Sequence, residues 1–273
     1  MNNSNTFENK EQKLFFARLD DLARRADGGT VAHSAFLTPG EVLAAERYFS
    51  EKGMKDRICF FGGYRDAQRK QIFLLPEYLA DTVDNTDFDA IAEMLAEDFE
   101  GAVKVIKIIG SGFRNLSHRD YLGSVLALGI ERSSLGDICI FDDSTALIFC
   151  TDALKALILS ELTAIGRDGV RVTEAKLDVN MPSTQKYQAF TDTVASERLD
   201  CVVASLCNLS RERAQNLIRA GLVEHNYECA LKIDVRVNEN DVISARGFGK
   251  FIIRDLSQAT KKGRLRLFAD KYV

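Results

Sequence analysis

Apolar residues in the last quarter of the chain recur at the spacing of a helix. Leu199, Val202, Val203 and Leu206 stand at i, i+3, i+4 and i+7, which places all four on one helical face. The pattern predicts a short helix with a single buried stripe.

A second short helix is predicted directly after the first. Ser210 can supply an N-cap oxygen, Ala214, Leu217 and Ile218 form an apolar face, and Gly221 stands where the chain needs a left-handed residue to leave the helix. The two helices are therefore expected to pack as a pair.

The chain closes with a hairpin and a basic strand. Residues 222–226 predict a turn and residues 241–247 a strand. Farther on, Arg264 and Arg266 alternate with leucines, so a strand there would turn both arginines to one face. Two interpretations stay open: this strand extends a binding surface, or it is a solvated edge strand protected by its charges.

The middle of the chain has the most regular order of elements. The expected elements are a helix at 88–99, a strand at 103–109, a helix at 118–128, strands at 137–141 and 146–150, a helix at 153–165 and a strand at 170–177. Their core order is βαββαβ, the split unit of ferredoxin-like and RRM-like folds. The strands lack the aromatics with which an RRM stacks bases, apart from Phe149. We therefore expect a structural or protein-facing sheet.

The first third predicts helices at 11–25 and 39–52 and a hairpin with strands at 58–61 and 72–75. Thr38, Pro39 and Glu41 form the start signal of the second helix, a capping box with proline at the first helical position. We interpret the charged loop 62–70 between the strands as a solvated turn, with contact to a partner as the alternative.

These elements predict an α+β fold with three domains. They are an N-terminal α/β-hairpin domain at 1–84, an RRM-like middle domain at 85–182, and a domain at 183–273 that contains the helix pair and the basic tail.

The distribution of charge along the chain indicates which part could bind a nucleic acid. The chain of 273 residues has a net charge of −4, which alone argues against nucleic-acid binding. Residues 196–273, however, contain 14 Lys and Arg against 10 Asp and Glu, a local charge of +4 that leaves −8 on residues 1–195. An acidic body with a basic end would orient the chain on RNA.

Other signals point to a cytoplasmic protein without a cofactor or a metal. The six cysteines include no C-x-x-C pair, which favours buried free thiols in a reducing compartment. His33 and His225 have no companions at metal-ligand spacing. We expect no signal peptide and no membrane span.

Arginines surround the predicted helix pair at positions 198, 211, 213 and 219. Because the apolar stripe must point inward, their guanidinium groups are expected on the rim, where they can bind phosphates through paired donors. The spacing over roughly 50 residues resembles the S4 RNA-binding domain, which implies a structured RNA as the ligand. A helical hairpin with a solvated basic face is the alternative.

This interpretation gives a set of candidate contacts with RNA and no catalytic residue. The expected RNA-binding residues are Ser196, Arg198, Ser210, Arg211, Arg213, Gln215, Arg219, Asn226, Arg246, Lys250, Lys261, Lys262, Arg264 and Arg266. Arg119, at the start of a helix opened by a capping box of Ser117 and Asp120, is an additional candidate.

The whole chain resembles the YlmH family of bacterial S4-domain proteins. The resemblance rests on the string from Ser117 to Ile138, on Phe61 to Tyr64, and on Gly247 to Arg264. It implies a non-enzymatic factor that binds rRNA and tRNA on the large ribosomal subunit and acts in the rescue of stalled nascent chains. Structured RNA and the large subunit are thus the expected partners, and neither DNA nor a membrane is expected.

Two other functions remain open. An S4-anchored RNA-modifying enzyme, of the pseudouridine synthase or methyltransferase type, would need a catalytic aspartate in a separate motif or a glycine-rich cofactor loop. A cell-division scaffold would leave the arginines without RNA. A map of RNA crosslinks would separate these classes.

Overall fold

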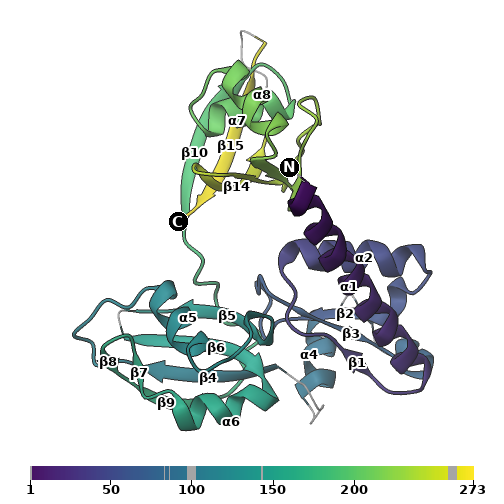
Figure 1. The fold of residues 1–273 in the computed structure, drawn as a ribbon, viewed down its shortest axis with the longest axis vertical. Coiled ribbons are helices and arrows are strands. Elements are labelled where there is room, and N and C mark those ends of the chain that lie inside the picture. Colours follow the sequence, from purple (N-terminus) through teal and green to yellow (C-terminus); the bar gives the residue numbers. More distant parts are fainter. Residues whose placement is uncertain (1, 83, 86, 97–102, 143, 258–262) are drawn as a thin grey trace. The chain divides into compact units, whose positions relative to one another are not determined.

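A computed structural model describes residues 2–82, 84–85, 87–96, 103–142, 144–257 and 263–273 of the chain (Figure 1). The fold is α+β, as predicted. Its contacts group into two compact units, Met1–Thr184 and Gln185–Val273. We call them unit 1 and unit 2 and describe each by itself.

Unit 1 begins with two helices, α1 (Asn2–Asp27) and α2 (Pro39–Glu51). The predicted capping box opens α2: Glu41 N donates to Thr38 Oγ1 at 3.3 Å, and Thr38 N donates to the Glu41 carboxylate at 2.7 Å. These contacts satisfy amide groups that the first helical turn leaves without a partner.

A small antiparallel sheet packs against these helices in the order β1-β3-β2. Its strands are β1 (Ala32–His33), β2 (Ile58–Phe61) and β3 (Gln71–Leu74). β2 and β3 form the predicted hairpin. The short helix η1 (Lys55–Arg57) leads from α2 into β2, and the helices α3 (Glu77–Ala80) and α4 (Phe88–Ala96) follow β3.

The second sheet of unit 1 has four antiparallel strands in the order β5-β6-β4-β9. In chain order the elements are β4 (Val103–Ile109), α5 (His118–Leu126), η2 (Arg132–Ser134), β5 (Leu135–Ile140), β6 (Thr145–Thr151), α6 (Asp152–Glu161) and β9 (Arg171–Ala175). The predicted βαββαβ order is therefore present. The helix predicted at 153–165 ends earlier, because 164–169 form a separate hairpin of β7 (Ala164–Ile165) and β8 (Asp168–Gly169) around Gly166, with a φ of +59°.

Both faces of this four-stranded sheet are buried within unit 1. Helices α5 and α6 cover one face, where Tyr121 and Ile158 pack against Ile106 and Ile148. On the other face Val105 and Phe149 belong to one buried cluster with residues of the N-terminal part, among them Phe36, Phe61, Tyr64, Phe73 and Leu95. The division between 1–84 and 85–182 therefore runs through a shared core.

The loop 62–70 is not a solvated turn, and that interpretation was wrong. Gly63 adopts a φ of +101°, and a Cβ there would lie 2.4 Å from a ring carbon of Phe149. Tyr64 is buried, its ring centroid lies 5.1 Å from that of Phe149, and its hydroxyl donates to Asp137 at 2.8 Å. Gly63 thus lets the loop backbone approach the sheet closely, which a side chain would prevent.

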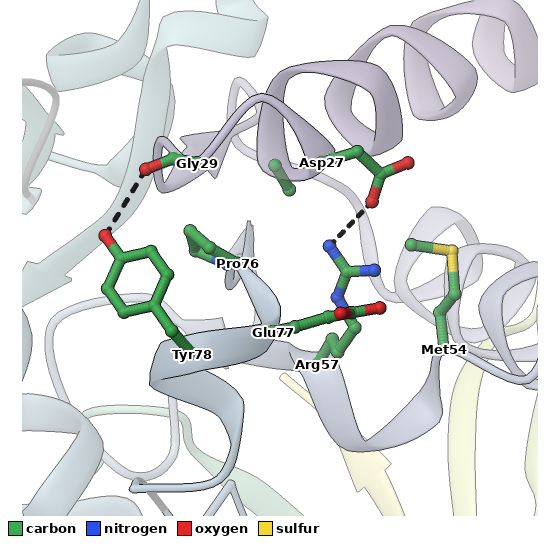
Figure 2. A pocket seen from close by; sticks show the side chains of 8 residues that line it. Asp27, Gly29, Met54, Arg57, Pro76, Glu77 and Tyr78 are labelled. Carbon is green, nitrogen blue, oxygen red and sulfur yellow. Dashed lines mark hydrogen bonds and ion pairs between the residues drawn. The ribbon is translucent and has the colours of Figure 1, made fainter.

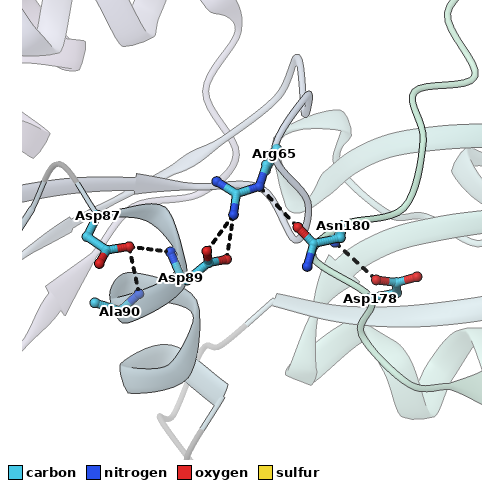
Figure 3. Close-up of polar contacts among 6 residues, drawn as sticks. All are labelled: Arg65, Asp87, Asp89, Ala90, Asp178 and Asn180. Carbon is cyan, nitrogen blue, oxygen red and sulfur yellow. Dashed lines mark hydrogen bonds and ion pairs between the residues drawn. The ribbon is translucent and has the colours of Figure 1, made fainter.

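Polar contacts fasten the same loop to two other segments (Figure 3). The Arg65 guanidinium forms an ion pair with Asp89 at 2.6 Å, and its Nε donates to Asn180 at 3.1 Å. Asp178 in turn accepts a hydrogen bond from the backbone N–H of Asn180 at 3.0 Å. The loop is thus joined both to α4 and to the end of unit 1.

Unit 2 has one sheet of six strands in the order β10-β15-β14-β13-β11-β12, with two helices on one face. Its elements are β10 (Tyr187–Val194), α7 (Leu199–Leu206), α8 (Arg211–Arg219), β11 (Val223–His225), β12 (Glu228–Cys229), β13 (Val242–Ala245), β14 (Gly249–Asp255) and β15 (Leu265–Tyr272). The two predicted helices are present.

The basic strand β15 is not an edge strand, and that alternative was wrong. It pairs with β10 along its whole length and with β14 on its other side. Leu267 and Ala269 point into the core beneath α7 and α8, whereas Arg266 is exposed. The predicted alternation of arginine and leucine is confirmed, but within an interior strand.

Candidate RNA-binding surface

The start of α7 is fixed by hydrogen bonds to a distant segment. Leu199 N donates to Val235 O at 2.8 Å, and Asp200 N donates to Ile233 O at 3.0 Å. Amide groups in the first turn of a helix have no partner within the helix, so the segment 233–235 replaces a capping side chain here. Helix α8 begins as predicted, with Arg213 N donating to Ser210 Oγ at 3.3 Å.

The Asp200 carboxylate organises the polar side of the helix pair. Its side chain is fully buried, and it accepts hydrogen bonds from Arg198 Nε at 3.1 Å, Arg211 Nε at 2.9 Å and Gln215 Nε2 at 2.7 Å. The side chains of Arg198 and Arg211 are themselves 38% and 53% exposed. A buried anion thus holds two solvent-accessible cations in place.

The network keeps Asp200 ionised. Burial alone would raise the pKa of its carboxyl group, but the hydrogen bonds from Arg198, Gln215 and Arg211 outweigh burial and hold that pKa far below its usual value. Arg211 uses Nε for this contact, so the outer end of its guanidinium fork can reach a ligand. A rigid arginine fork suits the oxygen pair of a phosphate.

The four predicted arginines do not all lie on the same flank of the helices. Arg211, Gln215 and Arg219 stand at i, i+4 and i+8 of α8, which forms one stripe. Arg213 is two residues from Arg211, or about 200° around the helix axis, so it lies on the opposite flank. Arg213 and Arg219 are both exposed.

Arg236, which the sequence analysis did not single out, lies beside Arg198. The two residues form an isolated antiparallel bridge, which sets their side chains on the same side. Arg236 also forms an ion pair with Glu197 at 2.7 Å and remains 72% exposed. The sequence gives no signal for this neighbour, because Arg236 reaches Arg198 only where the folded chain returns to the start of α7. We call Arg198, Arg211, Gln215, Arg219 and Arg236 the arginine surface.

Asn226 has a role within the fold. It occupies a turn with φ of +52°, its Nδ2 donates to Asp241 at 2.7 Å, and its Oδ1 accepts from Val242 N at 2.9 Å. His225 Nε2 lies 2.6 Å from the same carboxylate. Both ends of the Asn226 amide are therefore engaged in holding the hairpin.

Lys250 lies on the other face of the sheet, away from α7 and α8. Its Nζ is 4.7 Å from the ring centroid of Tyr227 and 4.5 Å from that of Tyr272, a cation–π arrangement between two rings. Burial lowers the pKa of this amine. Arg266 alternates outward from the core and points to the same face as Tyr272.

The remaining candidates are spread over the periphery of unit 2. Ser196 Oγ lies 3.4 Å from Cys201 Sγ, Arg246 is exposed in the turn between β13 and β14, and Arg264 Nη2 donates to Thr193 O at 2.5 Å. Lys261 and Lys262 lie outside the described residues. The structure thus brings Arg198, Arg211 and Gln215 together and distributes the others.

In unit 1, Arg119 is exposed at the start of α5. The capping box predicted there is confirmed: Ser117 N donates to Asp120 at 2.8 Å, and Ser117 Oγ donates to the same carboxylate at 2.6 Å. Arg119 forms no ion pair with any residue that the structure describes.

A surface pocket of about 610 Å³ lies between the end of α1, η1 and α3 (Figure 2). Arg57 forms an ion pair with Asp27 across it at 2.9 Å, and Tyr78 Oη donates to Gly29 O at 3.3 Å. Its lining residues include no cysteine, serine or histidine that a neighbouring base could activate.

Three observations concern cysteines, metals and membranes. The cysteines at 59, 139, 150, 201 and 207 are buried and free, whereas Cys229 is exposed and departs from the expectation. Within the described ranges, no three His, Cys, Asp or Glu side chains are grouped as ligands of a metal ion. None of the helices in those ranges is both long and apolar enough to cross a bilayer.

Comparison with known proteins defines the class and then the family. A family model described as "Putative RNA-binding domain in YlmH" matches residues 95–179, so the chain contains a domain of this RNA-binding class. Ribosome-associated protein quality control protein P2 of Bacillus subtilis (strain 168) is 32% identical over 235 residues, which are 85% of this chain and 84% of that protein. The chain therefore belongs to the YlmH family, which confirms the resemblance seen in the sequence. A solved structure, cell division protein ylmH from Streptococcus pneumoniae, is 20% identical with a TM-score of 0.46 and covers 61% of this chain and 92% of that one.

Proposed function

We propose that this chain is a non-enzymatic factor that binds structured RNA through the arginine surface. Its partners are rRNA and tRNA on the large ribosomal subunit, its compartment is the cytoplasm, and its role lies in the quality control of stalled nascent chains. In this proposal unit 2 is an S4-like domain, and residues 103–175 are an RRM-like domain.

The observation that carries the proposal is the buried Asp200. A buried carboxylate is costly to desolvate, and here it orients two arginines that remain accessible. Positioned guanidinium forks fit the regular phosphates of a folded RNA better than mobile lysines do. The B. subtilis relative supports the choice of partner, because its name describes a ribosome-associated quality control protein.

The test is charge reversal on the arginine surface without disturbing Asp200. Arg219→Glu is suitable because Arg219 is exposed in the last turn of α8 and no contact to Asp200 depends on it. We expect weaker co-sedimentation with purified large ribosomal subunits and a salt dependence that is shallower by about 0.7 to 0.9 for the lost phosphate contact.

Two matched variants make the result specific. Lys186→Glu makes the same change of charge just ahead of β10. Because α7 follows the other end of that strand, this variant should leave binding unchanged. Arg213→Glu reverses a charge on the opposite flank of α8, so its effect should be smaller than that of Arg219→Glu. Equal binding by wild type and Arg219→Glu, with both proteins folded, would refute the proposed surface.

A further inference from the structure

The RNA-binding class of residues 95–179 raises the question of which surface in this region can touch RNA. An RRM-like domain would offer the sheet face opposite its helices to the bases. Here that face is occupied by the chain's own residues, since Val105 and Phe149 are buried against Phe61 and Tyr64. Contacts with RNA from this region must therefore come from loops, sheet edges or the outer faces of the helices.

The loop between β4 and α5 presents a bare aromatic ring. Phe113 is 93% exposed, the highest exposure among the large hydrophobic residues that the structure describes. A single exposed apolar residue is common on protein surfaces, so exposure alone would prove nothing. What distinguishes Phe113 is that the loop carrying it is held in place.

Both ends of the loop are anchored. On one side Ser111 N donates to Asp168 at 3.1 Å, Ser111 Oγ donates to the same carboxylate, and Phe113 N donates to Ser111 Oγ at 3.2 Å. On the other side Leu116 packs against the core beneath α5. Gly112, with a φ of +78°, makes the turn between these anchors. A fixed loop presents its ring with little loss of conformational entropy on binding.

A pocket that contains two arginines begins at the next residue of the same loop. It measures about 350 Å³, and its lining includes Arg114, which follows Phe113 directly, and Arg167 from the β7–β8 turn. The pocket also contains the Asp120 carboxylate, but that group already accepts two hydrogen bonds from Ser117. Neither arginine forms an ion pair within the described part of the chain.

We propose that the loop 111–115 binds an unpaired nucleotide of RNA, whose base stacks on Phe113 while Arg114 and Arg167 contact the adjoining phosphates. Single-stranded RNA is recognised through this combination of an aromatic ring and nearby cations. The inference rests on the proposed RNA-binding function but concerns a different part of the RNA. The arginine surface on α7 and α8 would bind folded RNA, and this loop would bind a base outside a helix.

The experiment compares one RNA strand in two forms. A fluorescein-labelled strand of about 12 nucleotides without self-complementarity is used alone and annealed to its complement, and its binding to the full chain is followed by anisotropy. Phe113→Leu keeps the apolar volume but removes the aromatic face, and Phe113→Tyr keeps the face. We expect Phe113→Leu to weaken binding of the single strand by about fivefold or more and to leave duplex binding unchanged. Phe113→Tyr should bind as the wild type does.

Each outcome decides between the two proposals. If Phe113→Leu and wild type bind the single strand equally, or if the duplex loses as much affinity as the single strand, the loop does not stack a base and this inference fails. That failure leaves the arginine surface intact as long as Arg219→Glu still impairs subunit binding. If the wild type binds neither RNA nor ribosomal subunits, both proposals fail. Because Phe113 is exposed, an unchanged melting temperature confirms that each variant is folded.

Discussion

Asp200 shows how one buried residue can fix the side chains of an exposed surface. A buried carboxylate persists only when hydrogen bonds or opposite charges compensate for the lost water. Arg198, Arg211 and Gln215 provide that compensation, and in return their side chains lose rotational freedom. The entropy of fixing these side chains is lost during folding, so it would not weaken the proposed binding of RNA.

The lowered pKa of Asp200 predicts a specific pH dependence of stability. Since its folded pKa lies below the unfolded value of about 3.9, the ionised group stabilises the fold above that value and loses this contribution as pH falls toward the folded pKa. The free energy of unfolding of the wild type should exceed that of Asp200→Asn by a constant amount above about pH 5, and the gap should narrow below about pH 4. Urea unfolding across this range measures it. A gap of the same size at both ends would contradict the role of Asp200.

At the scale of elements, the loop 62–70 joins β2 to β3 and packs the small sheet against the larger one. Its charged residues suggested a solvated turn, yet Arg69 Nε donates to Leu135 O and Arg69 Nη2 donates to Phe36 O, both at 2.9 Å. Tyr64 of the same loop is buried against Phe149. The loop therefore holds the two sheets of unit 1 together through buried contacts and hydrogen bonds.

Gly63 and Gly29 form a matched pair for testing that connection. Both adopt positive φ, +101° and +87°, but a Cβ at Gly29 would meet nothing within 4 Å, whereas one at Gly63 would collide with Phe149. Gly29→Ala should reduce the free energy of unfolding by about 1–2 kcal/mol through backbone strain alone. Gly63→Ala should cost about 1–3 kcal/mol more through overpacking. Thermal or urea unfolding compares the two, and equal losses would mean that the loop yields without strain.

At the scale of the whole molecule, the shared core decides which parts can fold alone. Unit 2 has a core of its own, from Leu199 and Val202 to Ile253 and Leu267. The N-terminal part has a smaller cluster around Phe49 and Ile72. The other face of its small sheet, with Phe61 and Phe73, completes its packing only against the four-stranded sheet.

Fragments of the chain test this division. Residues 185–273 and residues 1–184 should each unfold in one cooperative transition, whereas residues 1–84 alone should lack one, because their exposed aromatic face has no partner. Circular dichroism during heating distinguishes these cases. A cooperative transition in the 1–84 fragment would instead support three independent domains.

The sequence determined the features that depend on near neighbours along the chain. The capping boxes at Thr38 and Ser117, the N-cap at Ser210 and the turn at Gly221 were all predicted, because each involves residues only a few positions apart. The buried stripe of α7 and the order of helices and strands along the middle region followed from periodicity in the same way. The family resemblance was also visible at this level.

Tertiary structure decided everything that depends on pairing between distant segments. The position of β15 between β10 and β14, the burial of the loop 62–70, and the neighbourhood of Arg236 and Arg198 could not be read from spacing, because each needs contacts across tens of residues. The same reason applies to the candidate sites. The sequence supplied arginines and a lone phenylalanine. Only the folded chain joins Asp200 to Arg211 and Asp168 to the loop of Phe113, and thereby fixes which side chains are held at the surface.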